Sequence, residues 1–282
     1  MPELPEVETT LLGLKPHLLH QTIQNITVRQ YQLRWPIPRD IHAKTRGHVI
    51  QTLSRRGKYL LIGLDNGTLL IHLGMSGRFS LVSPQTPPGK HDHIDVTLSN
   101  QLLLRYNDPR RFGAFLWVED RPILQHPLLV KLGLEPFDPE FTGSYLYQQA
   151  RKRTMPIKLF IMNHHIVVGV GNIYATEALF MVNLHPNTPA KHVSAIVMDK
   201  LATIIQTLLQ QAIQRGGTTL KDFLGTDGRP GYFSLELQAY GRNGLPCVNC
   251  ETLLTKCSIG QRTSTFCPNC QQMPLENPNT YL

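Results

Sequence analysis

The sequence has no cysteine before residue 247, only two tryptophans, and charged residues at just 17% of its 282 positions. No apolar run approaches the ~18–20 residues that a membrane-spanning helix needs. The opening MPELPEVETT lacks the basic start and the apolar stretch of a signal peptide. A Gly-X-Y period, a heptad pattern and internal repeats are also missing, which excludes collagenous and coiled-coil proteins. We therefore expect a globular, cytoplasmic protein.

Apolar residues make up 41% of the chain, so it can bury a real core, and its length favours two domains. Lys and Arg number 28 against 20 Asp and Glu, which gives a net charge of +8 and a pI near 9.3. Such an excess favours nucleic acid or another anionic surface as a partner. The alternative is charge that serves solubility alone.

Four of the five cysteines follow the pattern Cys-x2-Cys-x16-Cys-x2-Cys. Thiolates paired on two tight turns suit tetrahedral Zn2+, so we expect one structural zinc ion that holds a small C-terminal ribbon folded. Two disulfides are the alternative, which the lack of a secretion signal disfavours. The fifth, Cys257, fits an inert thiol between ribbon strands better than a redox residue. The predicted ligands are Cys247, Cys250, Cys267 and Cys270.

Apolar spacing predicts a helix at about Pro5–Leu19, followed by short strands up to about residue 120. Asp65-Asn66-Gly67 signals a tight hairpin between two of the strands, and the proline-rich segment 83–91 is predicted to be an exposed loop. Short strands separated by turns indicate an antiparallel sandwich or barrel. The predicted strands are Thr22–Arg29, His48–Leu53, Tyr59–Leu64, Thr68–Leu73, Arg78–Val82, Ile94–Leu98 and Leu102–Tyr106.

Beyond about residue 125 the pattern changes to helices, of which the last is long, amphipathic and stopped by Gly216-Gly217. Segment 217–234 is predicted to be a long mobile loop and segment 274–282 a loose tail. The predicted helices are Glu140–Arg151, Pro156–Met162, Ile173–Phe180 and Val193–Arg215.

Positive charge gathers in three segments of one sign. Solvated faces usually mix both signs, so the three segments together favour a surface that faces phosphate. For any one of them, an ordinary solvated face is the alternative. The clusters are Arg55, Arg56 and Lys58; Arg110 and Arg111; and Arg151, Lys152, Arg153 and Lys158.

The stretch Gly169-Val170-Gly171-Asn172 precedes a predicted helix. Glycines allow close backbone approach and a helix N-terminus presents free N–H groups, so this stretch is a candidate phosphate grip. The alternative is an ordinary glycine turn in which Asn172 is the N-cap.

Acid gathers at the N-terminus instead, at Glu3, Glu6 and Glu8. Removal of Met1 would leave Pro2 with a secondary amine, and an α-amine pKa of about 7.7–8.0 keeps part of it unprotonated. Such an amine can attack a sugar C1′ and form an iminium ion, with Glu3 handling the proton transfers. The alternative is that the acids merely favour the first turn of a helix.

A long series of motifs follows in order along nearly the whole chain: PELPEVE, RRGKYL, HLGMSG, KHDHIDV, DPRRFG, VVGVGNIYATEALF, GGTTLKDFLGTDGRPGYF, AYGRNGLPC and QRTSTFCPNCQ. With these motifs the chain resembles the formamidopyrimidine-DNA glycosylases, the Fpg or MutM family of bifunctional DNA repair enzymes. The related endonuclease VIII type has Gly in place of Leu4.

The resemblance implies that Pro2 is the nucleophile that displaces the damaged base and forms a Schiff base, with Glu3 as its acid/base partner. Lys58 matches the lysine assigned to proton donation in β-elimination. Arg262 matches the arginine assigned to δ-elimination, and a guanidinium is better suited to hold phosphate than to give up a proton.

The resemblance also implies DNA contacts. His91, Arg110 and Lys152 match contact positions, although a one-residue insertion in ARKRTMPIK leaves Arg151 and Arg153 as alternatives to Lys152. Asn172 matches an asparagine that grips phosphate.

Three side chains, those of Met75, Arg110 and Phe112, resemble the group that fills the gap left by a flipped nucleotide. Extrusion of a base leaves an unstacked hole, so such filling is physically required. Loop 217–234 resembles the segment that closes over the flipped purine.

Together these observations predict an α+β protein with a helix and an antiparallel β-sandwich in 1–125, a helical domain with a helix-two-turn-helix in 126–235, and a zinc ribbon with a tail in 236–282. The expected partner is double-stranded DNA with oxidised bases or abasic sites, in a basic cleft. We expect a monomer, associated with the nucleoid when on DNA, that removes oxidised purines and cuts the strand by β,δ-elimination. No redox or nucleotide cofactor is implied. The alternatives are a glycosylase for oxidised pyrimidines and a non-catalytic zinc-ribbon DNA-binding protein.

Overall fold

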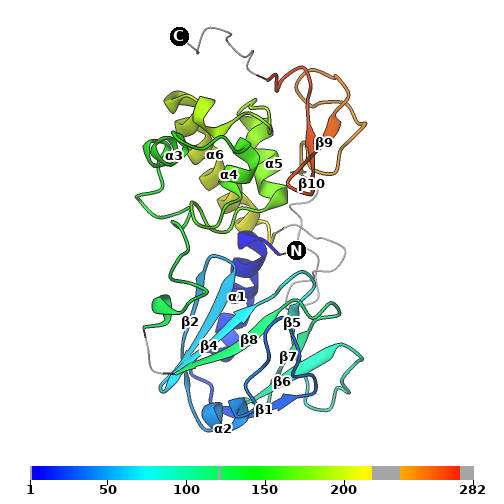
Figure 1. The fold of residues 1–282 in the computed structure, drawn as a ribbon. Coiled ribbons are helices and arrows are strands. Elements are labelled where there is room, and N and C mark those ends of the chain that lie inside the picture. The colour runs from blue at the N-terminus through cyan, green and yellow to red at the C-terminus, as the bar shows by residue number, and fades with distance from the viewer. Residues whose placement is uncertain (1, 120–121, 218–235, 274–282) are drawn as a thin grey trace. The chain divides into compact units, whose positions relative to one another are not determined.

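The computed structural model describes residues 2–119, 122–217 and 236–273. The chain divides into two compact units, residues 1–131 with 211–235 and residues 132–210 with 236–282 (Figure 1). The predicted boundaries near 125 and 235 stay a prediction. Apart from Gly217, the predicted loop 217–234 and the tail 274–282 lie outside the described residues. Within the described ranges, no helix is both long and apolar enough to cross a membrane.

The first unit contains a sandwich of two four-stranded antiparallel sheets, with strand orders β1-β6-β7-β5 and β2-β3-β4-β8 (Figure 1). Apolar side chains from both sheets form one continuous buried core, which confirms the predicted sandwich. The strands are β1 (Ile23–Val28), β2 (Ile50–Arg56), β3 (Tyr59–Leu64), β4 (Gly67–His72), β5 (Arg78–Val82), β6 (Asp92–Leu98), β7 (Leu103–Asn107) and β8 (Ala114–Glu119).

Helix α1 (Leu4–Leu18) packs against β2 and β3. Its buried face consists of Val7, Leu11, Leu14 and Leu18, at the spacing that predicted the helix. The same apolar stripe that makes the helix amphipathic therefore anchors its N-terminus to the sandwich.

The seven predicted strands all occur, with ends shifted by a few residues. Strand β8 and the short helix α2 (Ile41–Thr45) were missed. β8 buries the adjacent residues Ala114 and Phe115, so it does not alternate as a half-exposed strand does. β2 runs on to Arg56 because Arg55 and Arg56 pair with β3 across the hairpin.

The second unit is built on helix α5 (Asn172–Met181), which is buried along almost its whole length and packs against α4 (Ile157–Ile161) and the ribbon strand β10 (Arg262–Phe266). The predicted helices are confirmed, with ends within about three residues. Gly216 and Gly217, with φ of +78° and +80°, follow the last helix as predicted. The remaining elements are α3 (Gly143–Ala150), α6 (Ala195–Gln214), β9 (Thr255–Ile259) and the short 3-10 helices Ile123–Gln125 and Ala190–His192.

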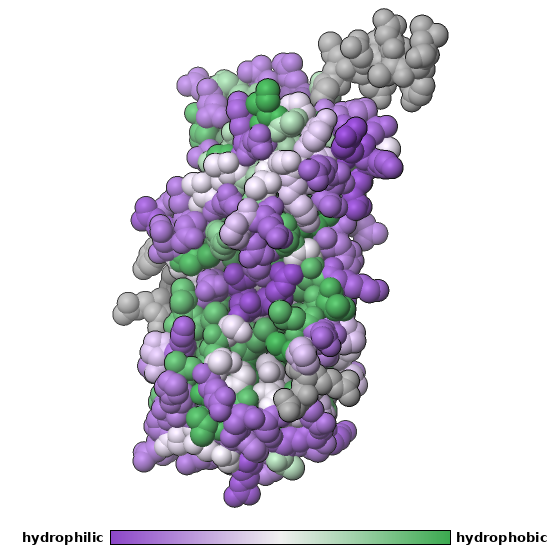
Figure 2. Space-filling view, turned by 90° about the vertical axis from the view of Figure 1, so that its left-hand side faces the viewer, coloured by the Kyte–Doolittle hydropathy of each residue, from purple (hydrophilic) through white to green (hydrophobic). Residues whose placement is uncertain are grey.

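Apolar side chains are not confined to the core. Figure 2 shows hydrophobic residues gathered over the sandwich on one face, with hydrophilic residues at its base. Among the larger exposed apolar side chains of this unit are Leu12 and Phe112, at 51% and 44% exposure. Isolated exposed leucines are normal in globular proteins, but an exposed aromatic ring next to charged residues calls for a reason.

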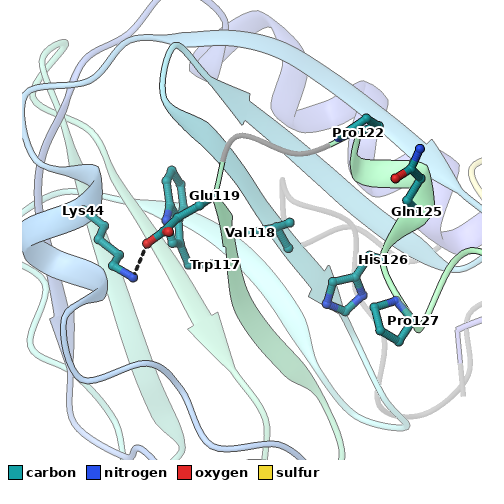
Figure 3. A pocket seen from close by; sticks show the side chains of 8 residues that line it. All are labelled: Lys44, Trp117, Val118, Glu119, Pro122, Gln125, His126 and Pro127. Atoms are coloured by element: carbon teal, nitrogen blue, oxygen red, sulfur yellow. Dashed lines mark ion pairs between the residues drawn. The ribbon is translucent and has the colours of Figure 1, made fainter.

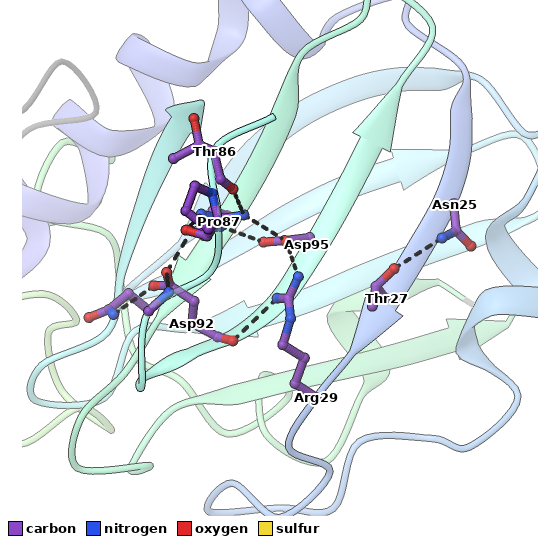
Figure 4. A network of polar contacts seen from close by, with 10 residues as sticks. Asn25, Thr27, Arg29, Thr86, Pro87, Asp92 and Asp95 are labelled. Atoms are coloured by element: carbon purple, nitrogen blue, oxygen red, sulfur yellow. Dashed lines mark hydrogen bonds and ion pairs between the residues drawn. The ribbon is translucent and has the colours of Figure 1, made fainter. Parts of the chain in front are cut away.

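A buried ion pair crosses the sheet β1-β6-β7-β5. Both oxygens of Asp95 accept hydrogen bonds from Arg105, at 2.9 and 3.0 Å, and Asp95 also pairs with Arg29 (Figure 4). Arg105 further donates to the carbonyl oxygens of Thr86 and Pro87, both at 3.0 Å, so it holds the middle of the loop between β5 and β6. Burial opposes ionisation of Asp95, but the two arginines outweigh it and lower the pKa of Asp95.

The Asp95 pair should make stability depend on pH. Since the folded pKa lies below the ordinary value of 3.8, ionised Asp95 stabilises the fold above that value, and the contribution is lost as the pH falls through the folded pKa. We expect Asp95→Asn to lower the free energy of unfolding by about 3 kcal/mol near neutrality, because the buried Arg105 loses its two hydrogen bonds to a carboxylate and keeps only the longer ion pair with Asp92, at 3.7 Å. The difference from wild type should shrink in acid.

Urea unfolding followed by tryptophan fluorescence measures this, because Trp35 and Trp117 both lie in the first unit. The matched control is Asp65→Asn, which breaks the exposed pair with His48 and should cost less than about 1 kcal/mol. An equal loss for Asp95→Asn in acid and at neutrality would contradict the assignment.

Candidate functional site

The start of α1 holds the predicted nucleophile and acid. Pro2 is buried, and Glu3 and Glu6 are 2% and 0% exposed. Glu3 is the N-cap: the backbone N–H of Glu3 donates to Glu6 Oε2 at 2.8 Å, and the Glu6 N–H donates to the Glu3 side chain. This reciprocal capping box fixes Glu3 beside Pro2. The simpler role in the first turn of a helix is thus correct for Glu6.

Gly217 packs against the carboxylate of Glu6. A Cβ atom at Gly217 would lie 3.0 Å from Glu6 Oε1, and the φ of +80° disfavours other residues there. The end of α6 therefore packs against the helix cap that carries Glu3.

Lys58 lies in the two-residue turn between β2 and β3, where Gly57 has a φ of +56°. Arg55 Nε donates to Glu8 Oε2 at 2.6 Å, which places this turn beside the first turns of α1. Arg55, which the sequence placed in a cluster of one sign, is therefore paired with an acid 47 residues away, Glu8.

His72, which the sequence analysis did not single out, lies at the end of β4 close to Lys58. Its ring lies 4.8 Å from the ring of Tyr59, and its Nδ1 accepts the Gly74 N–H at 3.0 Å. Burial, with added repulsion from Lys58 and Arg34, lowers the pKa of His72 to about 4. His72 is therefore neutral near pH 7 and carries its proton on Nε2, where it can donate a hydrogen bond.

The three predicted gap-filling residues lie on two turns of the first unit. Met75 is half-buried in the turn after β4, and Arg110 and Phe112 are exposed in the turn before β8. The Arg110 guanidinium lies 5.0 Å from the centre of the Phe112 ring, a cation–π distance. His91, half-buried just before β6, is linked to this turn because its carbonyl accepts the Asp108 N–H at 3.0 Å.

The second unit brings Asn172 and Arg262 together. Arg262 is exposed and begins β10, after a turn in which Gly260 and Gln261 both have positive φ. The carbonyl of the next residue, Thr263, accepts the Asn172 side-chain amide at 3.3 Å. The N-cap of α5 is Gly171 and not Asn172, so the alternative reading of Asn172 as the N-cap was wrong.

Lys158 was predicted as part of a basic surface, but it is fully buried. Its Nζ donates to Thr176 Oγ1 at 2.9 Å and to Ser264 Oγ at 2.6 Å. Lys158 therefore joins α4, α5 and β10, and it does not face solvent.

Lys152 lies just after the end of α3. Lys152 and its neighbours Arg151 and Arg153 are all exposed, and with Gln148 and Gln149 they line an open cavity of about 750 Å3. The Arg153 side chain is held against α3, because its Nε donates to the Gln149 carbonyl at 3.0 Å. The predicted basic surface is therefore present here, without distinguishing Lys152 from Arg151.

The four predicted zinc ligands converge at the ribbon, with their sulfur atoms within 4.8 Å of one another. Individual Sγ–Sγ distances of 3.4, 3.5 and 4.0 Å compare with about 3.8 Å for sulfurs at tetrahedral corners around zinc. None of the five cysteines forms a disulfide, so the disulfide alternative is wrong. The backbone N–H groups of Asn249 and Cys270 donate to the sulfurs of Cys247 and Cys267, a further fit to bound thiolates. The four cysteines fit one structural zinc ion.

A second buried carboxylate orders the approach to the ribbon. Glu177, on α5, accepts the backbone N–H groups of Gln238, Ala239 and Tyr240 at 2.6 to 2.9 Å. Burial raises the pKa of Glu177, although these three bonds oppose the shift. The sequence analysis did not single out Glu177, although it is the only acid between residues 141 and 180.

One further cavity of about 460 Å3 lies in the first unit (Figure 3). Lys44 pairs with Glu119 there at 2.5 Å. None of the predicted site residues lines this cavity. Its lining residues are Lys44, Trp117, Val118, Glu119, Pro122, Gln125, His126 and Pro127.

Comparison with known proteins places these features in a family. Three family models match the chain in order: the formamidopyrimidine-DNA glycosylase N-terminal domain over residues 1–115, its H2TH domain over 132–224, and the zinc finger found in FPG and IleRS over 244–272. The formamidopyrimidine-DNA glycosylases of Hahella chejuensis and Xylella fastidiosa (strain 9a5c) are 50% and 52% identical over 272 residues, which is 96% of this chain and all of theirs.

Solved structures agree. A variant of Lactococcus lactis FPG bound to DNA containing Fapy-dG matches with a TM-score of 0.90 and 32% identity, over 96% of this chain and 100% of that one. The MutM (FPG) protein from Thermus thermophilus matches with a TM-score of 0.87 and 34% identity, over 97% of this chain and 100% of that one. The chain therefore belongs to the formamidopyrimidine-DNA glycosylase family of base-excision repair enzymes, which are glycosylases and AP lyases.

Proposed function

We propose that this chain removes oxidised purines, such as 8-oxoguanine and formamidopyrimidines, from double-stranded DNA and then cuts the strand, with Pro2 as nucleophile. The observation that carries the proposal is the pairing of Pro2 with the N-cap Glu3 at the buried start of α1, next to the turn of Lys58. A non-catalytic DNA-binding protein has no need for an amine, an acid and a lysine in this arrangement.

The chemistry requires removal of Met1 so that Pro2 has a free secondary amine. The nitrogen lone pair attacks C1′, the glycosidic bond breaks, and its electron pair leaves with the base, which takes up a proton. Loss of the amine proton and cleavage of the C1′–O4′ bond, with a proton delivered to O4′ by Glu3, give the iminium ion. The iminium acts as an electron sink, so loss of a C2′ proton expels the 3′ phosphate, and a second elimination expels the 5′ phosphate.

The other predicted residues take supporting roles in this proposal. Lys58 supplies a proton during β-elimination, and Arg262 holds a phosphate that leaves or flanks the site. Asn172, His91 and Lys152 bind backbone phosphates.

Three side chains, those of Met75, Arg110 and Phe112, fill the gap in the duplex.

Zinc, when bound, is structural, because four thiolates leave no open position for water. It would supply folding energy to the ribbon that carries Arg262. We further propose that the enzyme acts as a cytoplasmic monomer on the nucleoid.

Borohydride trapping tests the nucleophile. Wild-type protein on an abasic duplex should give a covalent protein–DNA adduct, and Pro2→Gly should reduce its rate of formation by about 100-fold or more. Pro5→Ala is the matched control, because Pro5 has no free amine and should leave the adduct unchanged. Absence of a wild-type adduct, an undiminished adduct in Pro2→Gly, or an intact mass that retains Met1 would contradict the mechanism.

Excision profiles test the substrate class. Single-turnover base release should be at least about 10-fold faster from 8-oxoguanine than from thymine glycol, in duplexes that are otherwise identical. A preference for thymine glycol would favour the oxidised-pyrimidine alternative. The same protein on an undamaged duplex gives the background rate of base release.

Zinc removal should weaken DNA binding without unfolding the sandwich. We expect Cys250→Ser, or chelation, to raise the Kd for an abasic-analogue duplex by about 10-fold or more, since the ribbon then no longer holds Arg262 in place. Cys257→Ser is the matched control and should keep both zinc and affinity. Fluorescence anisotropy gives the Kd, and tryptophan fluorescence reports the sandwich. Equal losses for the two variants, or unfolding of the sandwich by Cys250→Ser, would refute the separate role of the ribbon.

A further inference from the structure

Asp108, whose side chain is 0% exposed, begins the turn that carries Arg110 and Phe112, and its carboxylate also bonds to the turn that carries Met75. Its Oδ1 accepts the Ser76 hydroxyl at 2.7 Å, in the turn of Met75. Its Oδ2 accepts the Gly113 N–H at 2.9 Å, in the turn of Phe112, and the Tyr106 hydroxyl at 3.3 Å. Each oxygen of one carboxylate thus holds a different turn.

Ser76 extends the link. Its Oγ, which donates to Asp108, also accepts the backbone N–H of Arg110 at 3.2 Å. The backbone of Asp108 contributes too, since its N–H donates to the His91 carbonyl at 3.0 Å and its carbonyl is 2.8 Å from His93 Nε2. Beyond its own turn, Asp108 therefore contacts two segments that lie far away in the sequence, at Ser76 and at His91 and His93.

The two turns also touch backbone to backbone. A Cβ atom at Gly74 would lie 2.5 Å from the Phe112 carbonyl carbon, and Gly74 has a φ of +66°. A Cβ at Gly113 would lie 1.9 Å from the Tyr106 hydroxyl and 3.1 Å from Asp108 Oδ2. The two backbones are thus in close contact, and a shift of either turn alone would break its hydrogen bond to the Asp108 carboxylate.

We propose that Asp108 is a positioning residue for base extrusion: it locks the turns of Met75 and Phe112 into one rigid wedge that enters the duplex. The inference rests on the proposed function, in which these side chains fill the gap. Separating stacked bases costs a few kcal/mol, so a wedge that is already ordered avoids an ordering cost when it inserts. Asp108 suits this task because its two carboxyl oxygens accept hydrogen bonds from different turns.

Stopped-flow fluorescence of 2-aminopurine placed opposite a tetrahydrofuran abasic site follows wedge insertion without chemistry. We expect Asp108→Asn and Ser76→Ala to slow the insertion phase by about 10-fold or more, because a small misplacement of a working group has large kinetic effects. Initial association, measured by anisotropy, should stay within about 2-fold, since it depends on phosphate contacts. Tyr106→Phe removes only the longest bond and should slow insertion by less than about 3-fold.

The matched control is Asp95→Asn, which removes another buried carboxylate from the same sandwich but touches neither turn. It should keep the wild-type insertion rate even where its thermal stability falls as far as that of Asp108→Asn. Equal slowing in Asp95→Asn, or wild-type insertion in Asp108→Asn and Ser76→Ala, would overturn the proposal. If Asp108→Asn does not fold, Ser76→Ala alone decides. A wild-type protein that neither inserts nor forms the borohydride adduct would overturn the proposed function as well, whereas a normal adduct with no insertion phase would overturn only the wedge.

Discussion

A carboxylate that leaves water must find hydrogen-bond donors, and this requirement organises both units of the protein. Glu6 satisfies it with the backbone at the start of α1, Asp108 with two turns of the sandwich, and Glu177 with three consecutive N–H groups before the ribbon. Apart from the Tyr106 hydroxyl, which bonds to Asp108 from β7, these donors lie in segments without regular secondary structure. The buried acids therefore order those segments, which strand pairing and helix packing leave unconstrained.

The exposed groups of the proposed site depend on this buried frame. Phe112 is a large apolar ring at 44% exposure, with the Arg110 guanidinium 5.0 Å from its centre. Exposure of such a ring to water is unfavourable, so the surrounding structure must hold it in place. In the second unit, the buried ammonium of Lys158 plays the role that Asp108 plays in the first. It joins α5 to β10 through Thr176 and Ser264, and so ties the strand of Arg262 to the helix that begins at Asn172.

Periodic features of this fold follow from the sequence, because their causes are local. The stripe on α1 and the strand limits of β3 follow from spacing alone, and the cysteine spacing is enough to predict the metal site. Strand β8 was missed because both of its faces contain apolar residues near its start, which removes the alternation. The roles proposed for Pro2 and Glu3 come from the order of motifs along the chain, since two residue types at a terminus do not by themselves define a reaction.

The features that residue spacing could not predict depend on contacts between residues that are far apart in the chain. Lys158 and Arg55 both looked like surface cations, yet one meets Ser264 across 106 residues and the other meets Glu8 across 47. A charge is read as solvent-facing only when no opposite charge or polar partner is near, and nearness in space is a property of the fold. Asp108 illustrates the converse. Within DPRRFG it looks like one acid among bases, and only the antiparallel pairing of β4 with β8 brings the turn of Ser76 to it. Supporting residues are therefore harder to predict than reactive ones, because a reactive group is recognised by its own chemistry, whereas a supporting group is recognised by what the fold places around it.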